Sequence, residues 1–372
     1  MKNIVYKGDI IKMKLKKLSS ILLIAGMVFS LAGCSNTEKK NNNQATIKEQ
    51  EVKNELEDKV VIYSTHGEAM LELVASEFEK ETGVKVEFIN LKGELADRVR
   101  AEKENPQSDV MFGGASSLFM DLKKEEAFES FEPTWGSKLD SLFKDSENYW
   151  FGTIKTPVMM FYNKDVISSE DAPKDWADLV DGKYENQIVF RNALSSSARA
   201  MYSALLQQYD KKDALEDGWE YMQAVDQNTK QYYGSGSLMM QALGRKEAGI
   251  SFAPLSSIID NKVKNNIPLE VVDATSGSPV ITDAIAVIKN APHPNAAKAF
   301  VEFAGSEKIQ SMFANEFNRM PTHPDAIANS PQWMQEITFK AMNVDWADIA
   351  AKQSEWMQKW GTEVKNTEKD PK

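Results

Sequence analysis

The chain has 372 residues, of which 42% are hydrophobic and 27% are charged, and both fractions are ordinary for globular proteins. This length predicts two or three domains, and the composition excludes a wholly disordered chain, a collagen and a polytopic membrane protein. The 44 basic and 55 acidic residues give a net charge of −11. Because general nucleic-acid binding needs a basic face, no nucleic-acid partner is expected.

The N-terminal segment has the pattern of a secretory signal. Three lysines between residues 14 and 17 precede an apolar stretch, residues 18–32, that is too short to span a bilayer and suits a signal-peptide core. The stretch ends in LAGC at 31–34, and small residues before a cysteine resemble the bacterial lipoprotein signal. Residues 1–33 are therefore predicted to be a signal peptide, with Met1 and Met13 as alternative starts.

Cys34 is the only cysteine, so no disulfide or cysteine metal site is possible. Lipidation of Cys34 is expected to anchor the protein to the extracellular face of the cell membrane. The alternative is a plain secretory signal followed by a chance cysteine. Residues 34–58 are polar and lack aromatic residues, which predicts a flexible tether between the membrane and the folded body.

Strands and helices alternate in the first half of the body. Strands are predicted at 60–63, 84–89 and 109–112, where short β-rich apolar runs end at polar residues or glycine. Apolar residues at helical spacing predict helices at 68–82 and 95–104. This alternation favours a parallel sheet with helices on both faces.

A second unit of the same kind follows. Strands are predicted at 187–190 and 248–252, and helices at 195–208, 213–227 and 237–245. The apolar stretches 154–162 and 280–288 can cross between two lobes. After Pro294, helix is predicted to follow helix to about residue 360. Trp333, Trp346, Trp356 and Trp360 have spacings that suit helix packing and are predicted to be core residues. His293 and His323 precede prolines and are predicted to be loop residues.

Three parts of the sequence resemble a known family. They are VIYS (61–64) with FEKETGVKV (78–86), NPQSDVMFGG (105–114), and DAIAVIK (283–289) with APHP (291–294). In order and spacing, these segments resemble the extracellular solute-binding proteins of bacterial ABC importers, over residues 58–330.

The resemblance implies a type II periplasmic-binding-protein-like α/β fold, with two lobes joined by two crossing strands and solute bound between them. It implies a first lobe at 59–157, a second lobe at 158–279, and a return to the first lobe with C-terminal helices at 280–372. It also implies a monomer without catalytic role, cofactor or bound metal, whose partners are a small solute and an ABC permease with its ATPase.

Ligands of open α/β sheets lie beyond the carboxyl ends of the strands, where helix N-termini present free N–H groups. Hydroxyl-rich or glycine-rich loops at such places predict an anion site. The predicted ligand-binding residues are Ser64, Thr65, His66, Gly114, Ala115, Ser195, Ser196, Ser197, Arg199, Tyr232, Tyr233, Ser235 and Asp283.

Each of these positions also has a purely structural explanation. Serine and threonine are common helix caps, and His66 is either a phosphate donor or a cap residue. Arg199 pairs either with a phosphate or carboxylate or with a surface acid. Tyr232 and Tyr233 contact the ligand or pack in the core.

The preferred ligand is a small anion, a sugar phosphate or a phosphonate, and iron(III) is the alternative. Iron-binding members of the family use adjacent tyrosines after the strand that corresponds to 249–252, where this chain has Ala253-Pro254-Leu255-Ser256. No HExxH, GxSxG or Walker motif is present, so no enzyme is expected. A secreted hydrolase and a solute-sensing receptor are the alternatives from other classes.

Overall fold

The computed structural model describes residues 55–91 and 94–370. The predicted signal peptide, the predicted lipidation site at Cys34 and most of the predicted tether lie outside these residues. Among the helices that are described, none is long and apolar enough to cross a membrane.

The first lobe is built on strands in the order β2-β1-β3-β10. β1 (Lys59–Ser64), β2 (Lys85–Asn90) and β3 (Val110–Ala115) are parallel, and β10 (Val280–Ile288) is antiparallel to β3. Alternate residues of these strands point to opposite faces. One face packs on α1 (Glu68–Thr82), α8 (Pro294–Ala304) and α9 (Glu307–Phe317), and the other on α2 (Leu95–Ala101) and α3 (Ser116–Lys124).

The second lobe continues with β8 (Ile250–Pro254), β6 (Ile188–Arg191) and β7 (Thr229–Tyr233), and β9 (Leu269–Val272) also joins it. One face is covered by α4 (Ser196–Asp210) and α5 (Leu215–Asn228). The other face is covered by α6 (Gly236–Gly244) and α7 (Leu255–Lys264).

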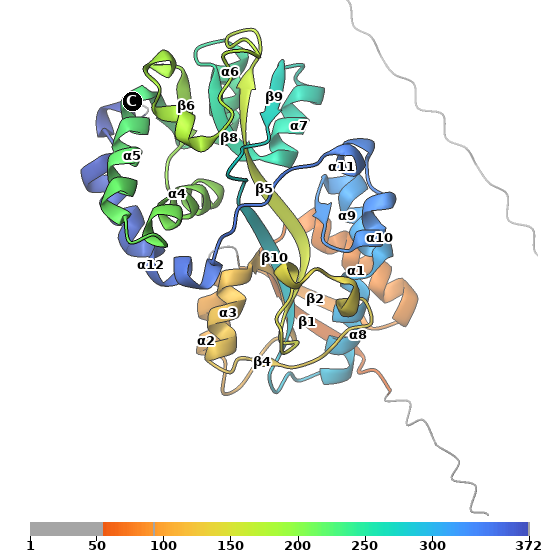
Figure 1. The fold of residues 1–372 in the computed structure, drawn as a ribbon. Coiled ribbons are helices and arrows are strands. Elements are labelled where there is room, and N and C mark those ends of the chain that lie inside the picture. Colours follow the sequence, from red (N-terminus) through yellow and green to blue (C-terminus); the bar gives the residue numbers. More distant parts are fainter. Residues whose placement is uncertain (1–54, 92–93, 371–372) are drawn as a thin grey trace, which may run out of the picture. The chain divides into compact units, whose positions relative to one another are not determined.

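β5 (Phe151–Asn163) belongs to both lobes. Its first half pairs antiparallel with β10, from Phe151 to Pro157, and its second half pairs with β8 and β9, from Val158 to Asn163. Figure 1 shows β5 and β10 side by side where the chain passes from one lobe to the other. The two predicted crossing strands are therefore confirmed as a hydrogen-bonded pair.

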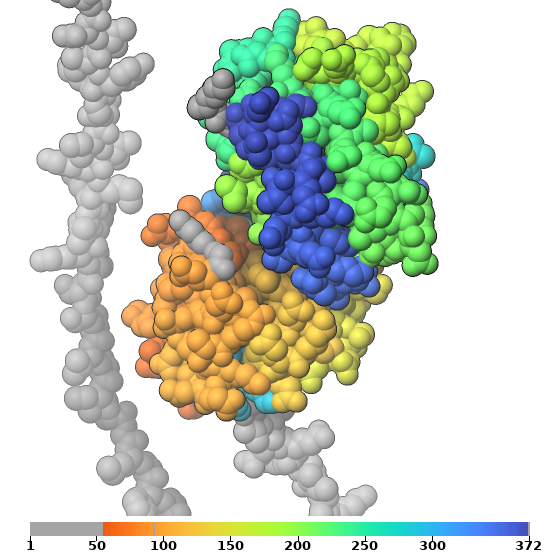
Figure 2. Space-filling model, turned by 90° about the vertical axis from the view of Figure 1, so that its left-hand side faces the viewer, coloured from red at the N-terminus to blue at the C-terminus, as the bar shows by residue number. Residues whose placement is uncertain are grey.

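Short elements complete the body. β4 (Phe128–Glu129) and β11 (Met320–Pro321) are two-residue strands, and α10 (Pro324–Ala328) and α11 (Gln332–Glu336) are single turns. α12 (Trp346–Lys359) packs on α4 of the second lobe and also reaches α3 of the first. In Figure 2 it forms the blue ridge along the green segment, ending against the orange and yellow part.

Most predicted elements are confirmed, with bounds shifted by a few residues. The prediction misses β7, β9, α3 and α7, and the helical prediction after Pro294 is interrupted by β11. Trp356 and Trp360 are buried in the second lobe's core, as predicted, whereas Trp333 and Trp346 are only partly buried.

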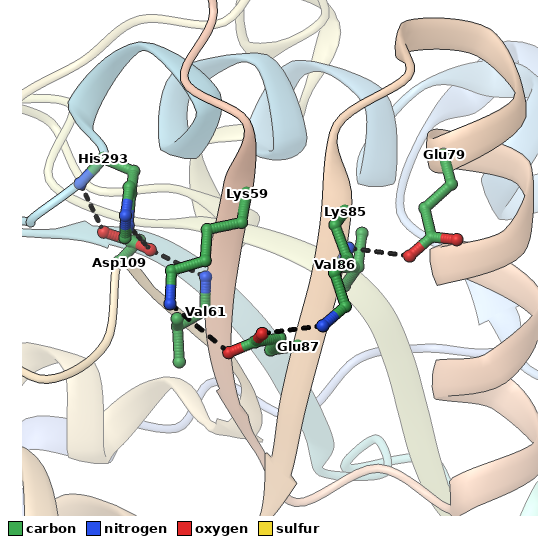
Figure 3. A network of polar contacts seen from close by, with 8 residues as sticks. All are labelled: Lys59, Val61, Glu79, Lys85, Val86, Glu87, Asp109 and His293. Atoms are coloured by element: carbon green, nitrogen blue, oxygen red, sulfur yellow. Dashed lines mark hydrogen bonds and ion pairs between the residues drawn. The ribbon is translucent and has the colours of Figure 1, made fainter.

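A buried carboxylate links the strands of the first lobe to α8 (Figure 3). Asp109, which is 0% exposed, accepts hydrogen bonds from the backbone N–H groups of Val61 and His293, both at 2.7 Å. The imidazole Nδ1 of His293 lies 2.9 Å from the same carboxylate. The prediction of His293 as a plain loop residue was therefore incomplete, because its ring contacts the carboxylate of Asp109, which lies just before β3 and far away in the sequence.

Glu57, at the end of the predicted tether, is attached to the same helix start. Its carboxylate accepts hydrogen bonds from the N–H groups of Asn295 and Ala296, at 3.3 and 2.7 Å. Burial acts to raise the pKa of Glu57, but these backbone hydrogen bonds outweigh it and hold the pKa below its ordinary value. The N-terminus of α8 thus has a side-chain partner from outside its own loop.

We expect Asp109→Ala to destabilise the fold strongly, because it leaves two backbone donors without their acceptor. Hydrogen bonds to a charged group contribute roughly 1.5–3 kcal/mol each, so the loss should be about 3–5 kcal/mol. A thermal melt should show a fall on the order of 10 °C. The control is Asp97→Ala, whose side chain is 82% exposed beside Arg100. It should change little, and equal melting temperatures for the two variants would contradict the assignment.

Candidate functional site: a cavity between the lobes

A cavity of about 610 Å³ lies where the two lobes face each other, beside the crossing strands. Its volume is in the range that holds a small ligand. The first lobe contributes the loops after β1 and β3. The second contributes the start of α4, and β10 and α12 complete the wall. The cavity therefore lies at the carboxyl ends of strands, where ligands of open α/β sheets bind.

Three helix N-termini meet at this cavity, those of α1, α3 and α4. Within the described residues, none of the three has a side-chain cap on its first N–H groups. α3 and α4 also have no acidic residue in the first turn. The free N–H groups and the positive ends of the helix dipoles favour a negatively charged ligand.

The loop after β1 is held by Ser64 and packed on Gly113. The Ser64 hydroxyl donates to the carbonyl of Phe112, at 2.6 Å, and accepts from the N–H of His66, at 3.1 Å. Gly113 has φ of +93°, and a Cβ there would lie 2.8 Å from both His66 Nε2 and Thr65 Oγ1. Only glycine lets these two cavity residues approach β3 so closely.

His66 is buried and neutral. Its side chain is 5% exposed, and Nε2 has no hydrogen-bond partner among the residues that the structure describes. Burial, and secondarily the positive charge of Arg319, lower the pKa of His66 to about 3. The imidazole thus offers a neutral polar atom at the cavity and no positive charge.

Positive charge at the cavity comes from two arginines. Arg199, on the first turn of α4, and Arg319, just before β11, both line it. Within the described part of the chain, neither guanidinium has a hydrogen-bonding or ion-pair partner. The other four arginines all have acceptors: Arg98, Arg100 and Arg245 pair with acids, and Arg191 donates to backbone carbonyls.

One carboxylate, Asp283 of β10, also lines the cavity. Burial raises the pKa of Asp283 to about 6, although the charge of Arg319 acts in the opposite direction. At pH 7 the titratable side chains of the wall therefore carry two positive charges and at most one negative charge.

The structure brings seven of the predicted ligand-binding residues to this cavity: Thr65, His66, Gly114, Ala115, Ser196, Arg199 and Asp283. Ser64 lies beneath the wall and orients the loop. Ser195 and Ser197 flank the exposed Ser196 and hydrogen-bond to each other through their hydroxyls, at 3.1 Å.

The other three predicted residues lie elsewhere. Tyr232 is buried in the second lobe's core, where its hydroxyl donates to Asp226 at 2.8 Å. Tyr233 is buried on the opposite face of β7. Ser235 caps α6 by accepting from the N–H of Leu238, at 3.5 Å. The helix start at α6 opens on a separate hollow of about 800 Å³, whose two arginines, Arg191 and Arg245, already have partners.

Sequence reasoning missed Arg319, Thr282 and the cavity face of α12. No local pattern marks Arg319, which follows the end of α9. In α12, the spacing of Trp346, Ile349, Ala350 and Gln353 was available, but it equally suits core packing. Among the described residues, no group of three or more histidine, cysteine, aspartate or glutamate side chains is placed to hold a metal ion.

Residues 74–341 match the family described as bacterial extracellular solute-binding proteins. This match spans more than half of the chain. The chain belongs to that family. A relative of this solute-binding protein is the "Probable ABC transporter periplasmic-binding protein y4fP" of Sinorhizobium fredii, 29% identical over 322 residues, covering 83% of this chain and 87% of the relative.

Solved structures of two-lobed binding proteins have the same fold. Apo ferric ion-binding protein A of Pasteurella haemolytica superposes with a TM-score of 0.71 at 20% identity, covering 82% of this chain and 97% of that one. AfuA of Actinobacillus pleuropneumoniae, with fructose-6-phosphate bound, gives a TM-score of 0.64 at 22% identity, covering 82% and 98%. The predicted α/β fold of two lobes is therefore confirmed.

We expect His66 to make the protein less stable in acid. Its pKa is lower in the folded state, at about 3, than the 6.5 of a free histidine, so the unfolded chain binds more protons between these values. The contribution of neutral His66 is thus present above pH 6.5 and is lost as the pH falls. Melting temperatures from pH 7.5 to 4.5 should fall less for His66→Gln than for the unmodified protein. If the melting temperatures of the two proteins fall in parallel with pH, the conclusion that buried His66 stays neutral is wrong.

Proposed function

We propose that this solute-binding protein is the binding component of an ABC importer, and that its ligand is a small anion with a phosphate or phosphonate group. The observation that carries the proposal is the pair of arginines, Arg199 and Arg319, which have no hydrogen-bond or ion-pair partner among the described residues and lie at a cavity where three helix N-termini meet. Guanidinium groups suit bidentate binding of a phosphate, and helix starts supply further N–H donors.

The wall charges favour an anion even when Asp283 is ionised, because two guanidinium groups face one carboxylate. Thr65, Ser116, Ser117 and Ser196 add hydroxyl groups around the same helix starts. Hydrogen bonds to a charged ligand group contribute roughly 1.5–3 kcal/mol each. A few such bonds support micromolar binding, which corresponds to about 8 kcal/mol.

Iron(III) receives less support from the cavity. No tyrosine is among the described residues that line it, and Tyr232 and Tyr233 are buried away from it. The ferric ion-binding relative shares the fold, whereas AfuA, with the same fold, was solved with a sugar phosphate. The donors at this cavity, arginines, hydroxyls and N–H groups, are those that an anion requires.

We further propose that the lobes close on the solute by bending at β5 and β10, and that the closed form delivers it to the permease without chemical change. Hinge closure needs only small dihedral changes in the segments that join two lobes. Incubation with the ligand followed by product analysis tests the second point, because a binder returns the solute intact.

The arginines give the direct test of the anion site. Arg199→Ala and Arg319→Ala should each weaken the binding of inorganic phosphate at least tenfold, a change of about 1.4 kcal/mol. The matched control is Arg245→Ala, which removes an exposed arginine paired with Glu247. Isothermal titration calorimetry measures all three. If the unmodified protein and the three variants bind phosphate with equal affinity, this cavity is not the anion site.

The variant Ser196→Asp tests the anion site in a second way, because it adds a negative charge at the start of α4. Ser196 is exposed, so the variant should keep the melting temperature of the ligand-free protein. Phosphate binding should be lost, because the carboxylate both repels the anion and occupies its space. Unchanged affinity would show that this helix start is not in the site.

We also propose that lipid on Cys34 holds the protein at the membrane. Cys34→Ser should release the mature body into the medium, because the side chain that would carry lipid is absent. Fractionation of cells and medium, followed by immunoblotting, measures the release. Membrane retention of the serine variant would contradict the anchor.

A further inference from the structure

One face of α12 forms part of the cavity wall. Trp346, Ile349, Ala350 and Gln353 line the cavity, and their i, i+3, i+4 and i+7 spacing places them on one side of the helix. α12 begins after residue 341, where the match to the family ends. This wall therefore comes from outside the matched segment, while Arg199 and Arg319 come from inside it.

α12 is held on the second lobe by hydrogen bonds, an ion pair and buried side chains. The Gln207 side chain donates to the carbonyl of Asp345, at 2.8 Å, and accepts from its N–H, at 2.9 Å. Lys352 pairs with Asp210 of α4 at 2.6 Å. Ile349 and Trp356 are buried in the core that α12 shares with α4. The wall is thus preorganised before a ligand arrives.

The wall that includes α12 is largely apolar. Trp346 and Ile281 pack only partly on the second lobe's core and line the cavity with their remaining surface. Leu118 lines it from the first lobe. Leu194, at the rim, is 90% exposed, more than any other large hydrophobic side chain that the structure describes. An exposed apolar surface beside a charged site is typical of a binding surface for an amphipathic ligand.

We infer that α12 sets the ligand specificity, with Trp346 stacking on a flat, apolar body of the ligand. This inference rests on the proposed function, because the same ligand carries the phosphate or phosphonate that Arg199 and Arg319 bind. Aromatic side chains gain energy from stacking on planar rings beyond the area that they bury. The ligand class is therefore an anion carried on an aromatic ring.

A ligand that carries many hydroxyl groups beside its anionic group suits the α12 wall less well. Gln353 is the one amide side chain on the α12 face, and its Nε2 already lies 3.2 Å from the Ser203 hydroxyl. Hydroxyl groups placed against Trp346, Ile349 and Ala350 would lose their water without gaining partners, which costs free energy for each group.

The test uses three probes that share the anionic group: phenyl phosphate, glucose 6-phosphate and inorganic phosphate. Each is titrated by calorimetry into the full-length protein and into Trp346→Ala and Trp346→Phe. Phenyl phosphate should bind the unmodified protein at least tenfold more tightly than the other two. Trp346→Ala should remove this preference while inorganic phosphate binds within about twofold of its original affinity, and Trp346→Phe should retain most of the preference.

The outcomes separate this inference from the proposed function. If all three probes bind the unmodified protein equally, the inference is wrong and the anion site stands. If none of them binds, the proposed function fails and the inference fails with it. If Trp346→Ala weakens phenyl phosphate and inorganic phosphate by the same factor, Trp346 supports the fold or the anion site, and the stacking role is rejected. Thermal melts of the ligand-free variants identify any loss of folding.

Discussion

The first half of β5 pairs antiparallel with β10 over Phe151 to Pro157, and this short ladder connects the two lobes. β10 continues into the first lobe's sheet by pairing with β3, and β5 continues into the second by pairing with β8 and β9. The two strands are thus shared by the sheets of both lobes, and they are where the proposed closure would bend. The cavity lies beside these strands, and residues 281–283 of β10 are part of its wall.

The ladder also shapes the site. Its register shifts between Asp283 and Ala284, and the pairing of β10 with β3 shifts at the same point. Such irregularities bend a strand and redirect its side chains, and they are frequent beside functional sites. Asp283 consequently faces the cavity within the influence of Arg319, where burial raises its pKa to about 6. With this pKa, Asp283 is mostly ionised at pH 7 and begins to lose its charge in slightly acid solution, where it opposes an anion less than an ordinary aspartate would.

Sequence reasoning succeeded where the determining pattern is local. The helix from Glu68 to Thr82 follows from apolar spacing and from Gly83, which adopts the left-handed conformation that ends it. The second half of β10, residues 284–288, is a continuous apolar run because helices cover both faces of the sheet there. β7 was missed because it is a short edge strand with polar residues, and its two tyrosines were then assigned to the ligand instead of the core.

The site was predictable only in part, for a related reason. Helix starts such as Ser196 have a local signature, so those loops were found. Arg319 has none, because what distinguishes it is that no side chain in the described ranges pairs with it, and such partners come from residues far along the chain. Trp346 has the helical spacing of a core residue, and only the position of α12 between the lobes places it at the cavity.

The two parts of the cavity have different physical requirements, and this bears on how one fold can serve different ligands. Binding an anion needs fixed N–H groups and cations, which the strand ends and helix starts of the α/β scaffold supply wherever the two lobes meet. Recognising the rest of the ligand needs only a surface of the right shape and polarity. A helix such as α12, which is anchored on the second lobe and reaches α3 of the first, can change that surface without altering the strands of the ladder. In this chain the surface of α12 at the cavity includes Trp346 and Ile349, and our two proposals therefore assign the charge of the ligand to the scaffold and the rest of the ligand to α12.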